Sequence, residues 1–546
     1  MIRSTSATSS RRTPEAPVSV PRWIPEIKVS KREELLLKRL GRTRKLFAFM
    51  REHRRDLFDD VFQDELATMY RDTGEGKEPV APALMAMALL LQAYVDASDA
   101  EAVELSVMDA RWQMVLGTLG SDDPAFSQGA LSAFRQRMIA HDMDRRLLER
   151  TVELAQRTKA FDYKKLPTTL RLAVDSRPLS GAGRVEDTVN LLGHAARKLL
   201  ECAASLSRRK PADLAAEIDT PALVASSTKR GLDIDWNDPA QKADAIKVLV
   251  AQIDRLEGWV HERFAADVDG PPLLEHLKTL AQLRAQDLEP DPKGGGPRIR
   301  RGVAEDRRVS VEDPQMRHGR KSKSRTFNGY KSHLAADLDT GLVVACDITP
   351  ANRPEAEALP RIEEDIGRYR RRNQIGELHI DRGYLASENV LQLHNRGVPV
   401  LSKPWVLREG ARFSKKDFVF DLRRMTVTCP ANQTEKIVLG TTVHFPADVC
   451  GACKLRRHCT GANRANGRSV TIAADERLQK KLRLAIATPH GRQRLRERVA
   501  IEHRLSHHAR KQGTRARYLG VRKNLFDARR HAATINLEAI QFANAA

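Results

Sequence analysis

Residues 327–348, with the sequence FNGYKSHLAADLDTGLVVACDI, decide the fold class of this chain. Residues 327–338 and 341–348 each predict a β-strand, and Asp339-Thr340-Gly341 between them is a turn sequence. Asp and Gly readily adopt the backbone conformations that tight turns need, so the pattern is typical of a β-hairpin. We therefore expect two antiparallel strands here.

The flanking regions extend this hairpin into a larger sheet. Residues 169–174 (TLRLAV) predict a short strand, and a loop should follow because residues 176–188 contain two glycines and a proline. Antiparallel strands followed by strands that helices connect indicate a mixed sheet with helices on both faces. In chain order the expected elements are strand 169–174, hairpin strands 327–338 and 341–348, helix 355–371, strand 377–380, helix 387–395 and strand 398–401.

Three acidic residues stand out by their positions in this pattern. Asp175 and Asp381 each follow a predicted strand, and Glu502 lies on a predicted helix that is crowded with arginine. Clustered carboxylates bind hard divalent cations such as Mg²⁺, and two such ions can stabilise the attacking and leaving oxygens at a phosphodiester. Each acid alone also has an ordinary interpretation as a turn or cap residue, so the hypothesis rests on the three together in a basic chain.

Helical patterns surround the predicted sheet. Apolar residues recur at helical spacing from residue 31 to about residue 157. Within this region, Ser98 and Glu101 form a capping box. A second helical region covers residues 189–288, with Asp238 and Pro239 as a cap and first turn. The expected fold class is therefore multidomain α+β, with an all-α N-terminal domain and a helical insertion in the α/β core.

Composition limits the class of protein. At about 150 residues per domain, 546 residues predict three or four structural units. Lys and Arg number 93 against 71 Asp and Glu, a net charge of +22 that should attract polyanions. The longest apolar run, residues 83–91, is about half the roughly 20 residues that cross a bilayer, which excludes a membrane-spanning protein. Residues 1–25 lack the apolar segment of a secretory signal.

Four of the six cysteines form a spaced group. Cys429, Cys450, Cys453 and Cys459 follow the pattern C-x20-C-x2-C-x5-C, and thiolates at such spacing suit tetrahedral Zn²⁺. A structural zinc ion would stabilise a small segment that lacks a large core of its own. Four reduced cysteines without metal are the alternative, and His458 is a possible substitute ligand. The low cysteine content indicates a reducing cytoplasm.

Residues 127–138 (SQGALSAFRQRM) predict a capped helix within the N-terminal region. Phe134 should face inward, whereas Arg135 and Arg137 should face outward, as on a helix that reads DNA. An ordinary surface helix of a bundle is an equal alternative, since arginines at this spacing are common.

Several separated blocks, in order, carry a resemblance that covers nearly the whole chain. The sequence resembles bacterial insertion-sequence transposases of the DDE superfamily. Blocks in a common order are far more specific than any single short motif. They are PVAPALMAMALLLQAYVDASDAEAVE (79–104), AVDSRPLSGAGRVEDTVNLL (173–192), TFNGYKSHLAAD (326–337), HIDRGY (379–384) and RVAIEHRLSHHARKQGTRARYLGVRKN (498–524).

The resemblance implies a ribonuclease-H-like catalytic core in which Asp175, Asp381 and Glu502 bind magnesium or manganese. It also implies cleavage at the element's ends and strand transfer into target double-stranded DNA. A dimer or larger synaptic complex in the bacterial cytoplasm, associated with the nucleoid, is expected by the same analogy. A catalytically inactive or repurposed DNA-binding protein, or a nuclease that cuts without joining, are the alternatives.

The family's glutamate helix gives a closer comparison. Related transposases carry an arginine four residues before the glutamate, a tyrosine three residues before that arginine, and a lysine seven residues after the glutamate. Arg498 matches the arginine, whereas Leu495 and Ala509 occupy the tyrosine and lysine positions. At about 100° per residue, Lys511 should point roughly opposite Glu502 on a regular helix.

The C-terminal segment is strongly basic. Residues 491–531 contain 13 lysines and arginines against 3 acids, a net charge of +10 in 41 residues. Such charge supplies phosphate contacts that position DNA without reading its bases. The expected DNA-binding residues are Arg498, Arg510, Lys511, Arg515, Arg517, Arg522 and Lys523, together with Lys331 of the hairpin.

These features predict seven parts. In chain order they are a flexible basic arm (1–30), an N-terminal helical domain for DNA-end binding (31–160), the first part of the catalytic core (165–188), a helical insertion (189–292), the continued core (293–404), a β-rich cysteine insert of zinc type (405–490) and a basic helical part of the core (491–546).

Overall fold

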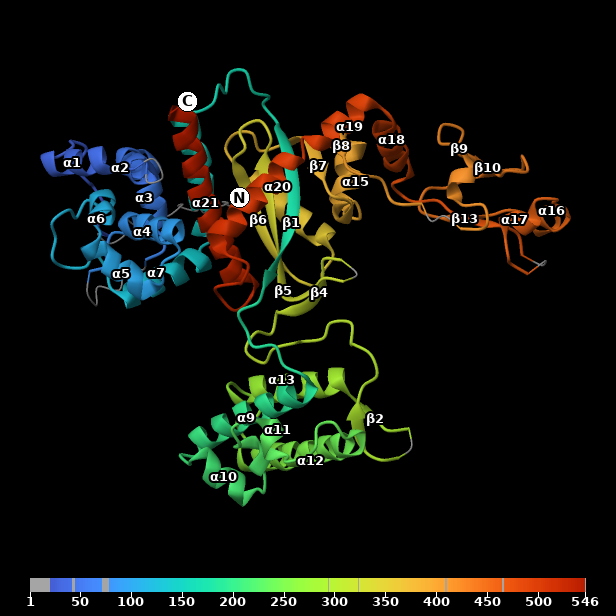
Figure 1. Cartoon of the computed structure of the whole chain (residues 1–546), viewed down its shortest axis with the longest axis horizontal. Helices are drawn as coiled ribbons and strands as arrows, with labels where there is room; N and C mark the ends of the chain where they lie inside the picture. Colours follow the sequence, from blue (N-terminus) through green and yellow to red (C-terminus); the bar gives the residue numbers. More distant parts are fainter. Residues whose placement is uncertain are drawn as a thin grey trace, which may run out of the picture.

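A six-stranded mixed β-sheet forms the centre of the computed structural model, which describes residues 20–41, 45–70, 78–292, 294–322, 324–407, 410–463 and 466–545 (Figure 1). The strands are β1 (Leu170–Ser180), β4 (Arg317–Arg320), β5 (Thr326–Asp337), β6 (Val343–Pro350), β7 (Ile375–Ile380) and β8 (Val400–Leu401). β5 pairs antiparallel with β1 on one edge and with β4 and β6 on the other. β7 pairs parallel with both β1 and β8. The predicted mixed α/β, multidomain class is confirmed.

The first strand is longer than the sequence predicts. β1 has 11 residues, so the loop expected from residue 176 begins only after Ser180. β5 is the reason, because its 12 residues supply a partner as far as the pair Ser180–Gly329. On the other edge of β1, the amide of Ser180 donates to Thr514 O. Pro178 lies two residues earlier, and its missing N–H would face this same edge. Because β7 ends before this point, the proline is tolerated there.

The N-terminal helices form one body with the last helix of the chain, α21 (Val521–Ala545), which packs between them and β6 (Figure 1). The N-terminal helices are α1 (Lys31–Arg39), α2 (Lys45–Leu57), α3 (Asp60–Ala67), α4 (Pro82–Val95), α5 (Asp99–Met108), α6 (Ala110–Leu116), α7 (Gln128–Ala140) and α8 (Met143–Arg157).

Within the described part of the chain, no helix combines the length and apolar character needed to cross a bilayer.

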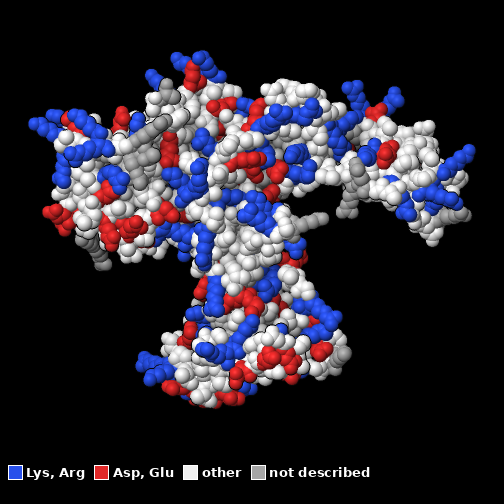
Figure 2. Space-filling model, in the orientation of Figure 1, with Lys and Arg blue, Asp and Glu red and all other residues white. Residues whose placement is uncertain are grey.

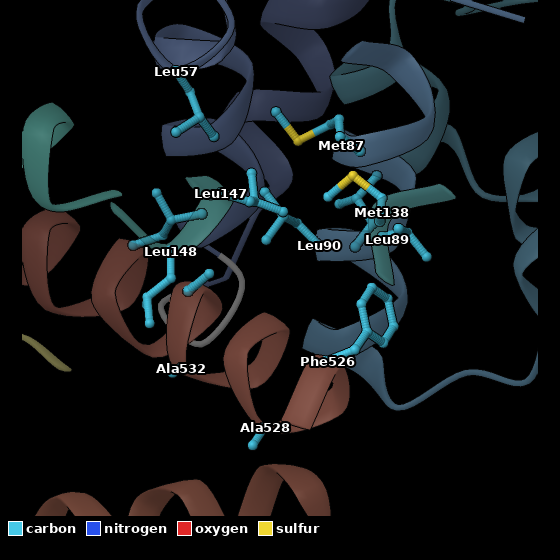
Figure 3. Packing of buried hydrophobic residues seen from close by; sticks show 14 of the residues in the cluster. Leu57, Met87, Leu89, Leu90, Met138, Leu147, Leu148, Phe526, Ala528 and Ala532 are labelled. Atoms are coloured by element: carbon cyan, nitrogen blue, oxygen red, sulfur yellow. The ribbon is translucent and has the colours of Figure 1, made fainter. Parts of the chain in front are cut away.

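The apolar core runs without a break from the N-terminal helices to the sheet. Met87 and Leu90 of α4 and Leu148 of α8 lie in the same packed cluster as Phe526 and Ala532 of α21 (Figure 3). Nearly all of α4 is buried, because this helix is apolar around most of its circumference. The cluster also includes residues of β1, β5 and β6, so the helical domain and the sheet share one core.

Asn536 of α21 closes the outer edge of the sheet at β6. Its Oδ1 accepts a hydrogen bond from Val343 N, and its Nδ2 donates to Val343 O, both at 2.8 Å. Nδ2 also donates to Thr151 Oγ1 of α8 at 2.9 Å. Asn536 is fully buried, so one side chain satisfies both backbone groups of an edge residue and ties the edge to two helices.

The region expected to be a helical insertion has a core of its own and lies beyond one end of the sheet (Figure 1). Its helices are mutually packed through α9, which contacts α10, α11, α12 and α13. The elements are α9 (Thr188–Leu206), α10 (Pro211–Glu217), η2 (Pro221–Leu223), α11 (Thr228–Gly231), α12 (Pro239–Arg263), α13 (Leu273–Asp287), β2 (Leu288–Pro290) and β3 (Pro297–Ile299).

The cysteine-containing segment extends as short strands and helices from the side of the sheet opposite the N-terminal helices (Figure 1). It has a small separate core that includes Phe418, Val427 and Phe445. Its elements are η5 (Lys415–Asp417), β9 (Val419–Asp421), β10 (Thr426–Thr428), β11 (Thr434–Lys436), β12 (Thr442–His444), α16 (Ala447–Ala452), α17 (Arg456–Cys459) and β13 (Ser469–Thr471).

The remaining helices join these parts to the sheet. η3 (Glu355–Ala358) and α14 (Leu359–Gly367) follow β6, and η4 (Arg382–Tyr384) and α15 (Glu388–Asn395) follow β7. After the cysteine segment the chain continues through α18 (Glu476–Ala487), α19 (Pro489–Arg496) and α20 (Val499–Gln512).

Two expectations for the N-terminal region need correction. Arg135 does not face outward: it is buried, pairs with Asp99 at 2.6 Å and donates to Tyr518 Oη at 3.2 Å. This hydrogen-bonded guanidinium lowers the pKa of Asp99 to about 2. Trp23, within the arm predicted over residues 1–30, is buried and its ring donates to Leu116 O, so it packs with the helical domain. Residues 1–19 of the predicted arm lie outside the described part.

We predict that Asn536→Leu destabilises the sheet edge. Two buried backbone groups of Val343 would lose their partner, at about 1–3 kcal/mol each, so the free energy of unfolding should fall by about 2–6 kcal/mol in urea titrations. Asn544→Leu, at an exposed position of the same helix, is the matched control and should stay within about 0.5 kcal/mol of the unaltered chain. Equal stability of the two variants would contradict this role for Asn536.

Candidate active site

The register of the sheet brings Asp175 and Asp381 together. The parallel pairing of β1 with β7 ends at Val174 and Ile380, and each aspartate is the next residue along its strand. Neighbouring positions on paired parallel strands lie about 4.8 Å apart in the pairing direction. The two carboxylates that the sequence placed after separate strands are therefore neighbours at one point of the sheet.

Glu502 reaches the same point from α20. Arg498, the cap residue of α20, contacts Asp175 Oδ2 at 2.7 Å through Nη1 and Glu502 Oε1 at 2.8 Å through Nη2. Asp175, Asp381 and Glu502 all line one pocket of about 530 Å³. The structure thus brings the three sequence-selected acids together, with one arginine bridging two of them.

The environment of the three acids is uneven. The Asp175 side chain is 16% exposed, whereas that of Glu502 is 51% exposed. Burial raises the pKa of Asp175 above its ordinary value, and the charge of Asp381 adds to the increase. The Ser176 backbone N–H and the Arg498 guanidinium act in the opposite direction. Arg498 therefore contacts both a largely buried carboxylate, the inner one of Asp175, and a half-exposed carboxylate, the outer one of Glu502.

Cationic side chains line the hollow on both sides of these acids. A second pocket shares Asp381, Arg498 and Glu502 with the first, and Trp405 contributes an aromatic ring to it. On the face shown in Figure 2, Lys and Arg side chains are interspersed with acidic ones. Besides the shared Arg498, the lining cations are Arg177, Arg320, Lys321 and Lys331 in the first pocket and Arg382, Lys403, Arg492 and Arg496 in the second.

A further group of acids and histidine, which the sequence did not predict, lies where β7 meets the junction between α19 and α20. Glu377, His379 and Glu497 place three potential ligand atoms within 4.8 Å of one another, the one such group found among the described residues. His379 Nε2 donates to Glu377 Oε1 at 2.5 Å. Arg171 contacts both glutamates, and Arg494 contacts Glu377. Two arginines already balance the two carboxylates, so we interpret the group as an ion-pair network.

Comparisons with known proteins identify the family. A family model described as "Transposase DDE domain" matches residues 423–541, and one described as "Transposase domain (DUF772)" matches residues 44–137. Together the two matches indicate an insertion-sequence transposase of the DDE type. The resemblance found in the sequence is thereby confirmed. No curated protein and no solved structure matches the chain.

The matched regions divide the site of this transposase. Residues 423–541 contain Glu502, Arg498 and the four spaced cysteines, so the cysteine segment lies within the matched DDE domain. Asp175 and Asp381 lie outside both matched regions. The sheet register, rather than the family match, therefore supplies the case for these two aspartates.

Most of the cations expected to bind DNA lie elsewhere in the transposase. Lys511 pairs with Glu538 at 2.7 Å, and Arg522 pairs with Asp144 at 2.5 Å. Arg517 donates to Ala97 O at 2.6 Å, and Arg515 to Ala182 O at 3.0 Å. Arg510 and Lys523 are exposed, without lining either pocket. Of the eight expected residues, Arg498 and Lys331 line the pocket that holds the acids.

A signal in the sequence could have found some of the missed cations. Arg382 and Lys403 come just after β7 and β8, at the same edge of the sheet as Asp381. The reasoning that selected acids at strand ends applies equally to these basic residues. Arg320 is the last residue of β4 and Lys321 follows it. The sequence did not predict this strand, so no comparable signal marked the two residues.

Both departures from the family's glutamate-helix motif face the site. Ala509 lines the first pocket and Leu495 lines the second. Lys511 points away from Glu502, as its helical position predicted, and its ammonium lies 4.3 Å from the ring centroid of Tyr94. Lys511 therefore does not supply the lysine that the family carries at the position of Ala509.

The four spaced cysteines line one pocket of about 420 Å³. Burial raises the pKa of Cys459, and the three other thiols add to the increase. The amide of Arg468 donates to Cys450 Sγ at 3.5 Å. No three of the sulfurs lie within 4.8 Å of one another among the described residues, whereas ligands of tetrahedral zinc lie about 3.8 Å apart. His458 is exposed and does not line this pocket.

We predict that His379→Gln leaves divalent-cation binding unchanged, because its group is an ion-pair network. Calorimetric titration of the full chain with Mn²⁺ should give the same number of ions and an affinity within about twofold of the unaltered protein. Asp381→Asn is the comparison variant, in which binding at the acid pocket should be lost. Loss of a bound ion in His379→Gln would contradict the ion-pair interpretation.

Proposed function

We propose that this transposase binds the ends of its insertion sequence and catalyses metal-dependent DNA cleavage and strand transfer. One observation carries the proposal: Asp175, Asp381 and Glu502, from three separate segments, line a single pocket with Arg498. In-line displacement at phosphorus requires positioned oxygens and charge stabilisation, and it needs no serine or cysteine nucleophile. The pocket contains groups suited to both tasks.

We propose further that the core is ribonuclease-H-like. Three antiparallel strands, β6, β5 and β1, are followed across the sheet by the parallel strands β7 and β8. This arrangement supports the fold that the resemblance implied. The two aspartates come from the central strand β1 and its parallel neighbour β7, where such a core would hold them.

The donor atoms of the pocket fit magnesium or manganese. Asp175, Asp381 and Glu502 offer carboxylate oxygens, and hard divalent cations prefer oxygen ligands. When bound, the ions would activate the attacking oxygen and stabilise the leaving oxygen. Arg498 would hold the inner and outer carboxylates in position, since its two nitrogens contact both. The half-exposed Glu502 leaves the pocket open to a DNA strand.

We propose that DNA crosses the acids along the two connected pockets. Cations on both sides can contact phosphates, and the ring of Trp405 can stack against a base. Lys331, Arg320 and Lys321 line the same pocket as Ala509, so the sheet can supply the positive charge that this helix position lacks. Arg510 and Lys523 remain candidates for peripheral phosphate contacts, because both are exposed.

The N-terminal helical domain is proposed to bind the element ends, in agreement with its match to a transposase domain. A dimer or larger synaptic complex is proposed because transposition joins two ends of one element. The substrate is then double-stranded DNA, both at the terminal repeats and at the target, within the bacterial nucleoid.

The cysteine segment is proposed to hold one structural zinc ion. Four thiols line its pocket, its own apolar core is small, and Arg468 already donates an N–H to one sulfur. Thiolates are suitable zinc ligands in kind and number, and binding would draw the sulfurs closer together. Zinc would then stabilise the fold of this segment without entering the reaction.

Two alternatives make different predictions. An inactive transposase would bind the element's ends without cutting, and Leu495 and Ala509 are the departures that favour this alternative. A nuclease without joining would cut but form no strand-transfer product. The intact set of three acids favours the active enzyme over the first alternative.

We predict that Asp381→Ala abolishes cleavage by at least about 1,000-fold and leaves DNA binding within about twofold, because it removes a metal ligand only. The test is cleavage of a plasmid that carries this gene with its native flanks, in Mg²⁺ or Mn²⁺. Asp213→Ala, at an exposed position of α10, is the control. Loss of both cleavage and end binding would indicate a structural acid, and binding without cleavage by the unaltered protein would indicate an inactive transposase.

We predict that Cys450→Ser lowers zinc content from about one ion per chain to near zero and destabilises the cysteine segment. Elemental analysis of protein purified without added metal measures the first effect, and thermal unfolding measures the second. Cys202→Ser, in the helical insertion, should retain full zinc content. Unaltered protein that contains no zinc would overturn the zinc proposal.

A further inference from the structure

The pocket of the three acids contains a fourth carboxylate, Glu355. Glu355 is the first residue of η3, which begins soon after β6. It is half-buried, whereas Glu357, two residues later, is exposed and does not line the pocket. The two glutamates of one short helix therefore have different surroundings, and only Glu355 shares the cavity with the catalytic candidates.

Glu355 lies between the two segments that carry Asp175 and Asp381. Its Oε1 accepts a hydrogen bond from the hydroxyl of Ser176 at 2.6 Å, and Ser176 directly follows Asp175. Its Oε2 lies against Gly383, so close that a Cβ atom on this glycine would come within 2.0 Å of it. Gly383 follows Asp381 by two residues. Glycine at this position thus allows the carboxylate to approach the end of β7.

Glu355 forms no ion pair, although cations also line its pocket. No Lys, Arg or His of the described chain lies within ion-pair distance of it, and Lys331 of the same pocket donates instead to Arg353 O at 2.7 Å. The pocket is lined by four carboxylates, and Arg498 pairs with two of them. A half-buried carboxylate that no protein cation contacts directly is stabilised by a bound positive ion. The charge of Glu355, together with that of Asp175, also acts on the buried Tyr384.

We propose that Glu355 is a fourth carboxylate ligand of the divalent cations in this pocket, acting together with Asp175, Asp381 and Glu502. This inference rests on the proposed metal-dependent function. Glu355 would thus take part in holding the ions, although it belongs to the helix after β6 and lies outside both regions that match transposase models.

The competing explanation is that Glu355 only fixes the chain after Asp175 through its bond to Ser176. The two roles are separable because Ser176→Ala removes that hydrogen bond and leaves the carboxylate in place. A ligand role predicts that Glu355→Gln, which keeps the shape and loses the charge, weakens ion binding while Ser176→Ala has a small effect.

The experiment is Mn²⁺ binding to the full chain, measured by calorimetry and by electron paramagnetic resonance without DNA. For Glu355→Gln we expect at least about tenfold weaker binding or the loss of one ion, because even the loss of a residue that only supports a metal ligand costs about 10–100-fold in affinity. Glu357→Gln is the matched control on the same helix and should bind as the unaltered protein does. Glu355→Asp should recover part of the affinity, and melting temperatures identify any variant that fails to fold.

The outcomes are distinguishable. Equal Mn²⁺ binding by Glu355→Gln and the unaltered protein, with binding lost in Asp381→Asn, would overturn the role of Glu355 and leave the proposed function standing. Weakened binding to the same extent in Ser176→Ala would also overturn it, in favour of a positioning role. If the unaltered protein bound no Mn²⁺ in this pocket, the proposed function and this inference would both fail.

Discussion

The packing of α21 against β6 and the N-terminal helices is the interaction on which the rest of the structure depends. Asn536 satisfies both backbone groups of Val343 at the sheet edge. Seven residues earlier, Arg529 is buried and contacts Asp142, Asp144 and Asp365, which belong to the N-terminal region and to α14. A buried guanidinium is stable only when carboxylates surround it, so this helix requires all its partners together. The last helix therefore joins the first domain to the sheet.

That constraint also positions the candidate active site. α20 leads toward α21, and buried Gln512 at the end of α20 donates to Asp527 of α21. The guanidinium of Arg177 on β1 contacts the same Gln512. α21, which packs against the sheet edge at β6, thus also holds the helix of Glu502 against β1. The register of β1 with β7 places the two aspartates independently of this contact.

Much of the fold and the three acids could be predicted from the sequence, because both follow from local patterns. The hairpin turn, the strand that carries Asp175, the strand end before Asp381 and the helix of Glu502 each lie within a few residues of the signal that predicts them. The basic segment was harder to interpret, since charge in a sequence carries no direction. Arg522 and Lys511 have acidic partners that lie 378 and 27 residues away along the chain, and no local pattern indicates such pairs. Arg135 was misassigned for the same reason, because Asp99 is 36 residues away.

The sequence by itself determined the class of fold, the order of its elements, the family and the oxygen-rich chemistry of the three acids. These properties depend on residue type and short-range spacing. Tertiary structure alone decided that β1 continues past Asp175 and that Glu355 and the cations at the end of β4 share the pocket of the three acids. It also decided that the cations after β7 and β8 line the adjoining pocket, and that much of the basic tail holds the molecule together. The reason is physical: whether a charged side chain meets DNA, a metal ion or a buried carboxylate depends on which distant segments pack beside it.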